Sequence, residues 1–160
     1  MARVYLGLGS NVGDGAATIR AAFAELSGIL YNALLSRLWR SAAMYVVDQG
    51  DFINAAAGGD TELSPHELLA AVNGIEASFG RDRASERPKG PRTLDIDILL
   101  YGDLVLKERN LILPHAGLKE RRFALQPLLD LDPELLDPEG GSAYSEILET
   151  LPPQGIYLLE

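Results

Sequence analysis

Two helical patterns, each bounded by its own start and stop signals, constrain the fold of this chain more than any other feature of its sequence. The first spans residues 14–28, where Asp14 can cap a helix whose apolar residues recur at helical spacing up to Gly28. The second spans residues 64–80 and begins with Ser64-Pro65-His66-Glu67, a capping box with proline at the first helical position. The sequence therefore predicts two amphipathic helices at these positions.

Strand-like segments surround the two helices. We expect extended segments at residues 3–8, 34–42, 52–58, 94–101 and 104–106, the last two joined by the hairpin signal Gly102-Asp103. A third helix is expected at about residues 117–129, before an acidic tail punctuated by prolines. This alternation, with hairpin turns in 160 residues, favours a single domain over residues 1–160, with a compact α+β sandwich rather than a doubly wound parallel sheet.

The chain contains no cysteine. This excludes disulfides, thiolate-bound zinc or iron–sulfur sites, and any cysteine nucleophile. The apolar run that precedes Gly9-Ser10-Asn11 is too short for a signal-peptide core or a membrane span. We therefore expect a cytoplasmic protein without a membrane partner.

The formal charge of −9 is unevenly distributed along the chain. Residues 81–122 hold ten of the fourteen Lys and Arg side chains and carry a net charge of +3, whereas residues 123–160 hold no basic side chain and eight acidic ones. A short basic segment in an acidic protein is typical of a focused site for a polyanionic small molecule. We therefore expect small-molecule substrates and no nucleic-acid partner.

Asp95 and Asp97 lie in the strand-like segment 94–101, where apolar and polar residues alternate with a period of two. Alternation places Leu94, Ile96, Ile98 and Leu100 toward the core and both aspartates on the opposite face. Two carboxylates about 6.6–6.8 Å apart on one strand face repel each other unless a cation lies between them. A solvated strand face with two charges is the alternative interpretation of the same pattern.

The residues around this strand favour the interpretation that Asp95 and Asp97 bind a cation. Mg²⁺ is commonly held by one or two carboxylates together with substrate phosphates, and arginines can bind phosphate oxygens through paired hydrogen bonds. Basic residues flank the strand on both sides, and about half of them are expected to be ordinary surface charges: Arg81, Arg83, Arg87, Lys89 and Arg92 before it, and Arg109, Lys119, Arg121 and Arg122 after it. The combination indicates a site for a nucleoside triphosphate.

Familiar phosphate-binding motifs do not fit. The glycines of Gly7-Leu8-Gly9 and Gly13 miss the dinucleotide-binding spacing by one residue, and no P-loop motif occurs.

Of the two histidines, His66 is expected to be exposed in a helical first turn. His115 lies within the basic segment, where a phosphate contact is favoured over a purely local hydrogen bond.

Several segments together resemble the 6-hydroxymethyl-7,8-dihydropterin pyrophosphokinase family of folate biosynthesis. They occur in order between residue 4 and about residue 130: VYLGLGSN from Val4, DFINAA from Asp51, GRDR from Gly80, GPRTLDIDILL from Gly90, Leu113-Pro114-His115 and Arg121-Arg122-Phe123. The resemblance implies a ferredoxin-like α+β fold, with a mostly antiparallel sheet and flanking helices. It also implies a transferase that moves pyrophosphate from ATP to the pterin's hydroxymethyl group and releases AMP.

The resemblance further implies a role for individual residues. Asp95 and Asp97 would hold two Mg²⁺ ions, and with Arg81 and Arg92 they would form the catalytic set. The remaining implied contacts are Glu76, Arg83, Arg92, Ile98, His115 and Arg121 with ATP, and Ser41, Ala42, Met44, Phe52, Asn54 and Phe123 with the pterin. The segments 45–50 and 81–92 would close over ATP.

Some positions depart from the family pattern, and two other functions stay open. The segment 85–89 lacks the usual tryptophan, Ala116 replaces an aromatic residue, Asn110 and Ile112 lack frequent polar contacts, and Ala42-Ala43 lack prolines. One alternative is a non-catalytic nucleotide-sensing module, which would not need the aspartate pair. The other is a different Mg²⁺-dependent kinase or nucleotidyltransferase, which would not need Asn54 and Phe123.

Overall fold

The computed structural model describes residues 1–42, 51–80 and 93–159. Its elements follow one another along the chain in this order: β1 (Ala2–Ser10), α1 (Gly15–Leu26), β2 (Tyr31–Leu35), β3 (Trp39–Ser41), β4 (Phe52–Thr61), α2 (Pro65–Ser78), β5 (Asp95–Tyr101), β6 (Leu106–Lys107), β7 (Ile112–Leu113), the 3-10 helix η1 (Leu118–Glu120), α3 (Arg122–Leu131), α4 (Tyr144–Thr150) and β8 (Ile156–Leu158).

The two predicted helices, α1 and α2, are confirmed together with their caps. Asp14 Oδ1 accepts a hydrogen bond from the Ala17 N–H at 3.1 Å. At α2, the Ser64 N–H donates to Glu67 Oε1 at 2.8 Å and the Glu67 N–H donates to Ser64 Oγ at 3.2 Å. Both partners of the capping box are therefore satisfied, which fixes where α2 begins.

The main sheet has the strand order β5-β1-β4-β3-β8, and β2 also pairs with β4. All of these pairs are antiparallel. The order of elements β1-α1-β2/β3-β4-α2-β5 is the βαββαβ pattern of ferredoxin-like folds. The predicted α+β sandwich with a mostly antiparallel sheet is confirmed.

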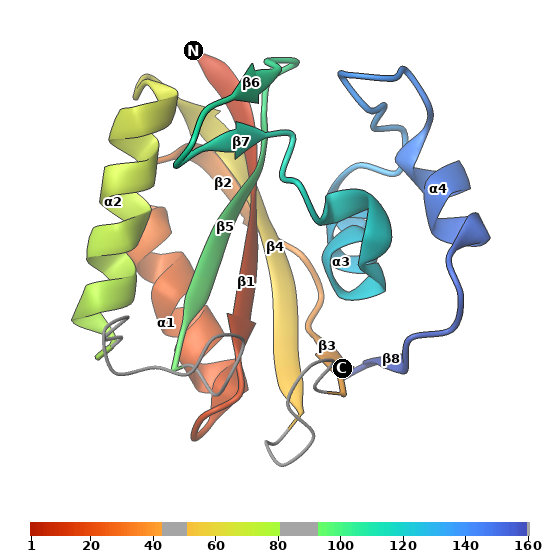
Figure 1. The fold of residues 1–160 in the computed structure, drawn as a ribbon. Coiled ribbons are helices and arrows are strands. Elements are labelled where there is room, and N and C mark those ends of the chain that lie inside the picture. The colour runs from red at the N-terminus through yellow and green to blue at the C-terminus, as the bar shows by residue number, and fades with distance from the viewer. Residues whose placement is uncertain (43–50, 81–92, 160) are drawn as a thin grey trace.

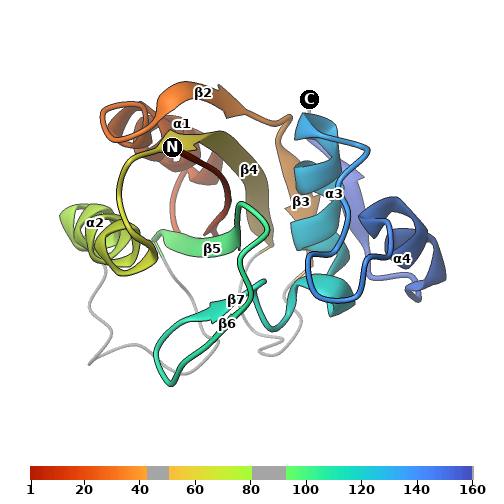
Figure 2. The ribbon, with the colours of Figure 1, turned by 90° about the horizontal axis from the view of Figure 1, so that it is seen from above.

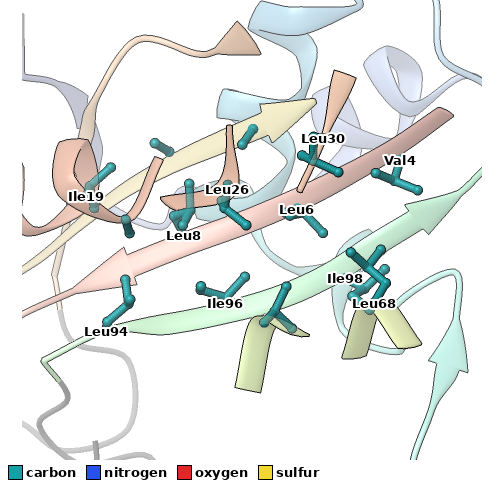
Figure 3. Packing of buried hydrophobic residues seen from close by; sticks show 14 of the residues in the cluster. Val4, Leu6, Leu8, Ile19, Leu26, Leu30, Leu68, Leu94, Ile96 and Ile98 are labelled. Atoms are coloured by element: carbon teal, nitrogen blue, oxygen red, sulfur yellow. The ribbon is translucent and has the colours of Figure 1, made fainter. Parts of the chain in front are cut away.

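Helices cover both faces of this sheet (Figures 1 and 2). On one face, Val4, Leu6 and Leu8 of β1 pack with α1, α2 and alternate residues of β5, as Figure 3 shows. On the other face, Tyr5 packs with residues of α3 and α4 in a second buried cluster. We call this second side of the sheet the α3 face. Both faces of β1 are buried from Val4 to Leu6, which explains why this part of the sequence reads as a nearly continuous apolar run.

The prediction for the last part of strand 94–101 is wrong at Leu100. Leu94, Ile96 and Ile98 belong to the first core as expected, but Leu99 and Leu100 both belong to the second. The register between β1 and β5 shifts between Tyr5 and Leu6, so Leu99 is an extra residue on β5. A β-bulge of this kind reverses the side-chain alternation beyond it.

The segment after β5 also differs from expectation. Gly102 forms a turn, with the Leu104 N–H donating to the Tyr101 carbonyl at 3.0 Å, but β6 does not pair with β5. Instead β6 pairs with β7 in a separate two-stranded sheet. The helix expected at 117–129 is divided into η1 and α3, because Arg121 between them is extended with φ −123° and ψ 108°.

The extended segment expected at 34–42 is divided into two strands that pair with β4. At the break, Ser36 Oγ accepts a hydrogen bond from the Ala56 N–H at 2.8 Å, so a side chain satisfies a strand amide. The acidic tail contributes α4 and β8, neither of which was predicted. β8 pairs with β3, which places the C-terminal segment at the edge of the main sheet.

Candidate active site

Asp95 and Asp97 lie side by side on the α3 face of the edge strand β5. Asp95 pairs with Gly9 of β1 and Asp97 with Gly7, whereas Ile96 and Ile98 point into the core on the other face. The side chain of Asp97 is 37% exposed. The predicted alternation is therefore confirmed for this part of the strand, and both carboxylates can be reached from solvent.

The donor set of this pair fits Mg²⁺. Both side chains are carboxylates, the hard oxygen ligands that this ion prefers. Within residues 1–42, 51–80 and 93–159, no group of three or more His, Cys, Asp and Glu side chains is clustered to hold a metal by itself. An ion held by two aspartates keeps most of its coordination positions for water and phosphate oxygens, as Mg²⁺ usually does.

Two glycines form the sheet surface beside the aspartates. Gly9 is paired with Asp95 on one side and with Asn54 of β4 on the other. A Cβ atom at Gly9 would lie 3.7 Å from Asn54 Oδ1 and 3.8 Å from Phe52 Cδ1, which are ordinary contact distances. Packing among residues 1–42, 51–80 and 93–159 thus leaves room for a methyl group at Gly9, and the bare backbone separates the carboxylates from Asn54.

Asn54 is buried and its amide is held in one orientation. Its Nδ2 donates to Ser41 Oγ at 2.8 Å and to the Phe52 carbonyl at 3.5 Å, and residues Ser41 and Asn54 are both 4% exposed. Ser41 ends β3 and is paired with Phe52, so the structure brings together three of the residues predicted to contact the pterin. Ala42 follows directly and is exposed.

His115 faces the aspartate pair from the segment after β7. Its N–H donates to the Leu99 carbonyl at 3.0 Å, and its ring Nδ1 accepts from the Gly117 N–H at 3.1 Å. The remaining ring nitrogen, Nε2, lies 3.7 Å from Asp97 Oδ1. Because Nδ1 is an acceptor, the neutral ring carries its proton on Nε2, on the side of Asp97.

Burial lowers the pKa of His115 below its usual value, and the positive charge of Arg121 lowers it further. The carboxylate of Asp95 acts in the opposite direction but does not outweigh these effects. The neutral imidazole is therefore favoured at pH 7, so the proton on Nε2 is available as a hydrogen-bond donor without a full positive charge.

Arg121 lies at the junction between η1 and α3. Its guanidinium carbon is 5.7 Å from the centroid of the Phe123 ring. A Cβ atom at Gly117 would come within 2.7 Å of Arg121 Cζ and Nε, so the glycine allows the guanidinium to lie against the backbone. His115, Arg121 and Phe123 are thus linked through this one turn of chain.

Glu76 and Ile98, both predicted to contact ATP, are buried in the structure. Glu76 is 1% exposed, and its Oε2 accepts a hydrogen bond from the Ile96 N–H at 2.8 Å. It therefore connects α2 to the outer edge of β5, the strand that carries the aspartates. The Ile98 side chain is 4% exposed and lies in the first core, so its main chain is the part that could reach a nucleotide.

The remaining predicted site residues lie outside the described ranges, and two of the basic residues near the site have structural roles. Met44, Arg81, Arg83 and Arg92 lie outside the described residues, as do the segments 45–50 and 81–92 that were expected to close over ATP. Lys119 forms an ion pair with the buried Asp137 at 3.1 Å. Arg122 donates to two main-chain carbonyls of the C-terminal segment. These two residues have structural partners, whereas Arg121 lies at the Phe123 ring and its charge acts on His115.

The sequence interpretation assigned no role to Gly9, Gly117 or Gln154. Gly9 directly precedes Ser10, and Gly117 follows His115 by two residues. Their closeness to these motif residues could have indicated that both glycines belong to the site. Gln154 carried no signal, because its contacts are with residues about 30 positions earlier in the chain.

The family model of 7,8-dihydro-6-hydroxymethylpterin-pyrophosphokinase (HPPK) matches residues 5–133 of the chain. The chain belongs to the HPPK family. A 2-amino-4-hydroxy-6-hydroxymethyldihydropteridine pyrophosphokinase of Methylorubrum extorquens is 42% identical over 162 residues, covering 100% of both chains. One of Pseudomonas aeruginosa is 40% identical, covering 96% of this chain and 94% of the relative. The protein is therefore a pyrophosphokinase, a transferase of the kinase type.

Longer proteins also contain an HPPK region. The folic acid synthesis protein fol1 of Schizosaccharomyces pombe is 42% identical over 96% of this chain, which spans 21% of that relative. The solved HPPK-DHPS of Plasmodium falciparum with pteroate superimposes with a TM-score of 0.75 at 14% identity, covering 92% of this chain and 42% of that one. This likeness supports the ferredoxin-like fold. No helix in the described ranges is long and apolar enough to cross a bilayer.

Proposed function

We propose that this protein transfers pyrophosphate from ATP to the hydroxymethyl group of 6-hydroxymethyl-7,8-dihydropterin, in a Mg²⁺-dependent reaction that gives AMP and the pterin diphosphate. Membership of the HPPK family supports the reaction class. The observation that carries the assignment is the position of Asp95 and Asp97 across the bare backbone of Gly7 and Gly9 from Asn54. Two substrates that meet above this surface would each find the polar groups they need.

Asp95 and Asp97 would hold two Mg²⁺ ions. When bound, the ions supply positive charge that offsets the negative charge developing on the transferring phosphates. The side chains of this chain then have mainly a positioning and electrostatic role. Little covalent chemistry is required of the protein, and no nucleophilic side chain is invoked.

The pterin would bind at the Asn54 end of the surface. Asn54 Nδ2 donates to Ser41 Oγ and to the Phe52 carbonyl, and the carbonyl can only accept, so it fixes which way the amide faces. The Oδ1 atom of Asn54 would bond the polar edge of the pterin, while Phe52 and Phe123 would stack on its ring. Ala42 and Met44 would complete the wall beside it.

The triphosphate would bind at the aspartate end. We propose that Arg121 and the Nε2–H of His115 donate to phosphate oxygens, together with Arg81, Arg83 and Arg92. Glu76 would hold β5 in place, and the main chain of Ile98 would contact the nucleotide. The hydroxymethyl oxygen forms a bond to the β-phosphorus as the bond from that phosphorus to the α,β-bridging oxygen breaks. The hydroxyl proton passes to solvent, and AMP carries away the electron pair of the broken bond.

Chromatographic analysis of the products tests the proposal. The protein is incubated with ATP, Mg²⁺ and the dihydropterin, beside Asp97→Asn and the control Asp103→Asn, an exposed aspartate in the turn after β5. We expect AMP and a pterin diphosphate from the wild type and the control, and at least a hundredfold less from Asp97→Asn, about the loss seen when a transition-state charge contact is removed.

Other products would contradict this reaction. ADP would indicate transfer of a single phosphoryl group, and release of pyrophosphate would indicate a nucleotidyltransferase. Intact ATP with tight nucleotide binding would favour the sensing module. We also propose that residues 1–160 act as one domain in the cytoplasm, on small molecules alone and without nucleic acid.

A further inference from the structure

A side chain near the C-terminus bridges the two peptide groups that flank Arg121. Gln154 Oε1 accepts a hydrogen bond from the Arg122 N–H at 2.8 Å, and Gln154 Nε2 donates to the Glu120 carbonyl at 2.9 Å. A single amide group thus contacts the residue before Arg121 and the residue after it. Because an acceptor meets an N–H and a donor meets a carbonyl, only one orientation of the amide satisfies both.

The bridge lies where the helical path is interrupted. Arg121 is extended between η1 and α3. It is the N-cap residue of α3, but its side chain makes no capping hydrogen bond. An N–H in the first turn of a helix has no partner within the helix, and Gln154 supplies one for Arg122. The same amide fixes the Glu120 carbonyl, so the extended conformation of Arg121 is held on both sides.

Further contacts anchor the bridging segment. The Arg122 side chain donates from Nε to the Pro152 carbonyl at 2.9 Å and from Nη2 to the Leu151 carbonyl at 2.6 Å. Residues 151–154 lie between α4, which packs on α3, and β8, which pairs with β3. The segment is therefore attached at both ends before Gln154 reaches the junction.

We infer that Gln154 is a positioning residue that sets the direction of Arg121 and Phe123 toward the two substrates. Gln154 lies beyond residue 133, where the match to the family model ends. It acts through the main chain at residues 120–122 and does not itself touch either substrate. The inference rests on the proposed function, since it assigns Arg121 to the phosphates and Phe123 to the pterin.

The test compares Gln154→Ala and Gln154→Glu with the control Thr150→Val. Thr150 Oγ1 donates to the Ile147 carbonyl at 2.7 Å in the same C-terminal region, and in the described structure its side chain makes no hydrogen bond to residues 120–122. Two readouts are used: hydrogen exchange of the Arg122 amide, and the kcat and KM values for ATP and the dihydropterin.

We expect Gln154→Ala to speed exchange of the Arg122 amide and to raise both KM values roughly tenfold, the effect of losing about two hydrogen bonds, with kcat within about twofold of the wild type. Gln154→Glu keeps the acceptor for the Arg122 N–H but loses the donor to Glu120. It should retain slow exchange at Arg122 and show a smaller rise in both KM values. Thr150→Val should change neither readout.

Unchanged KM values in Gln154→Ala, or a fall in kcat alone, would overturn the inference. Equal effects of Gln154→Ala and Thr150→Val would overturn it too, because they would indicate general loosening of the C-terminal segment. Absence of any pyrophosphoryl transfer by the wild type would instead contradict the proposed function. The exchange measurement is independent of activity, so an unchanged rate at Arg122 would then still reject the bridge itself.

Discussion

Single glycines on the sheet serve two different purposes. At Gly59, a Cβ atom would lie 3.0 Å from Leu30 Cβ and 3.1 Å from the Tyr31 carbonyl oxygen, so internal packing requires the glycine. At Gly9 the nearest atoms of the described part of the chain are at ordinary contact distances, so packing against these residues does not require a glycine. Under the proposed function, the bare backbone at Gly9 leaves room for the dihydropterin that would lie on it.

Gly9→Ala should separate these purposes. We expect the free energy of unfolding to change by less than about 0.5 kcal/mol, because the methyl group fits. Binding of the dihydropterin should weaken about tenfold or more, since the methyl group would occupy the surface between Asn54 and Asp95. Urea denaturation and calorimetric titration with the pterin measure the two effects.

Gly59→Ala is the matched control. It should lower the free energy of unfolding by about 1–3 kcal/mol through overpacking against Leu30. The folded fraction should still bind the pterin with unchanged affinity. Equal pterin affinity of Gly9→Ala and the wild type would contradict the role assigned to Gly9.

Strand β5 depends on a hydrogen bond from another element that the sequence could not reveal. It lies at the edge of the main sheet and carries both aspartates. Glu76 of α2 satisfies the Ile96 N–H there, 20 residues away along the chain. The sequence indicated α2 and β5 separately, but a helix-to-strand hydrogen bond depends on how the two elements pack.

Glu76→Ala should lower the free energy of unfolding by about 1–3 kcal/mol, because it leaves a buried N–H without its partner. Glu76→Gln keeps an oxygen acceptor and should cost less. The order of stability in urea denaturation, wild type above Gln above Ala, checks this explanation. Hydrogen exchange of the Ile96 amide should follow the same order, and similar exchange in all three proteins would contradict it.

At the scale of the whole molecule, a second core joins the C-terminal segment to the sheet. Asp137 is buried in that part of the chain, where Lys119 and the Glu139 N–H both donate to its carboxylate. Burial alone would raise the pKa of Asp137, but the hydrogen bonds from Glu139 and Lys119 outweigh it and hold the pKa below the usual value. Burial and the nearby Asp137 charge also raise the pKa of Tyr144.

A lowered carboxyl pKa makes the stability depend on pH in a defined direction. The folded state binds this proton less tightly than the unfolded state, so Asp137 stabilises the protein above its ordinary pKa near 3.8 and stops doing so as pH falls through the lowered value. Asp137→Asn should cost about 1–3 kcal/mol at pH 7. The difference from the wild type should shrink below about pH 4, as measured by urea denaturation at several pH values. A difference that stays constant with pH would contradict this assignment.

The sequence by itself determined the local features of this protein. The caps at Asp14 and Ser64 and the alternation from Leu94 to Ile98 each depend on neighbouring residues, so α1, α2 and the shared face of Asp95 and Asp97 could be predicted. The motifs that identify the family also lie in short continuous segments.

Only the tertiary structure decided the remainder. The bulge at Leu99 and the pairing of β8 with β3 depend on contacts between distant segments, and the division of the predicted third helix at Arg121 lies where Gln154 makes its hydrogen bonds. Such contacts depend on which faces are buried against each other, and local propensity carries no information about them. Gln154 illustrates this limit, since its position in the sequence gives no indication that its side chain bonds the residues on both sides of Arg121.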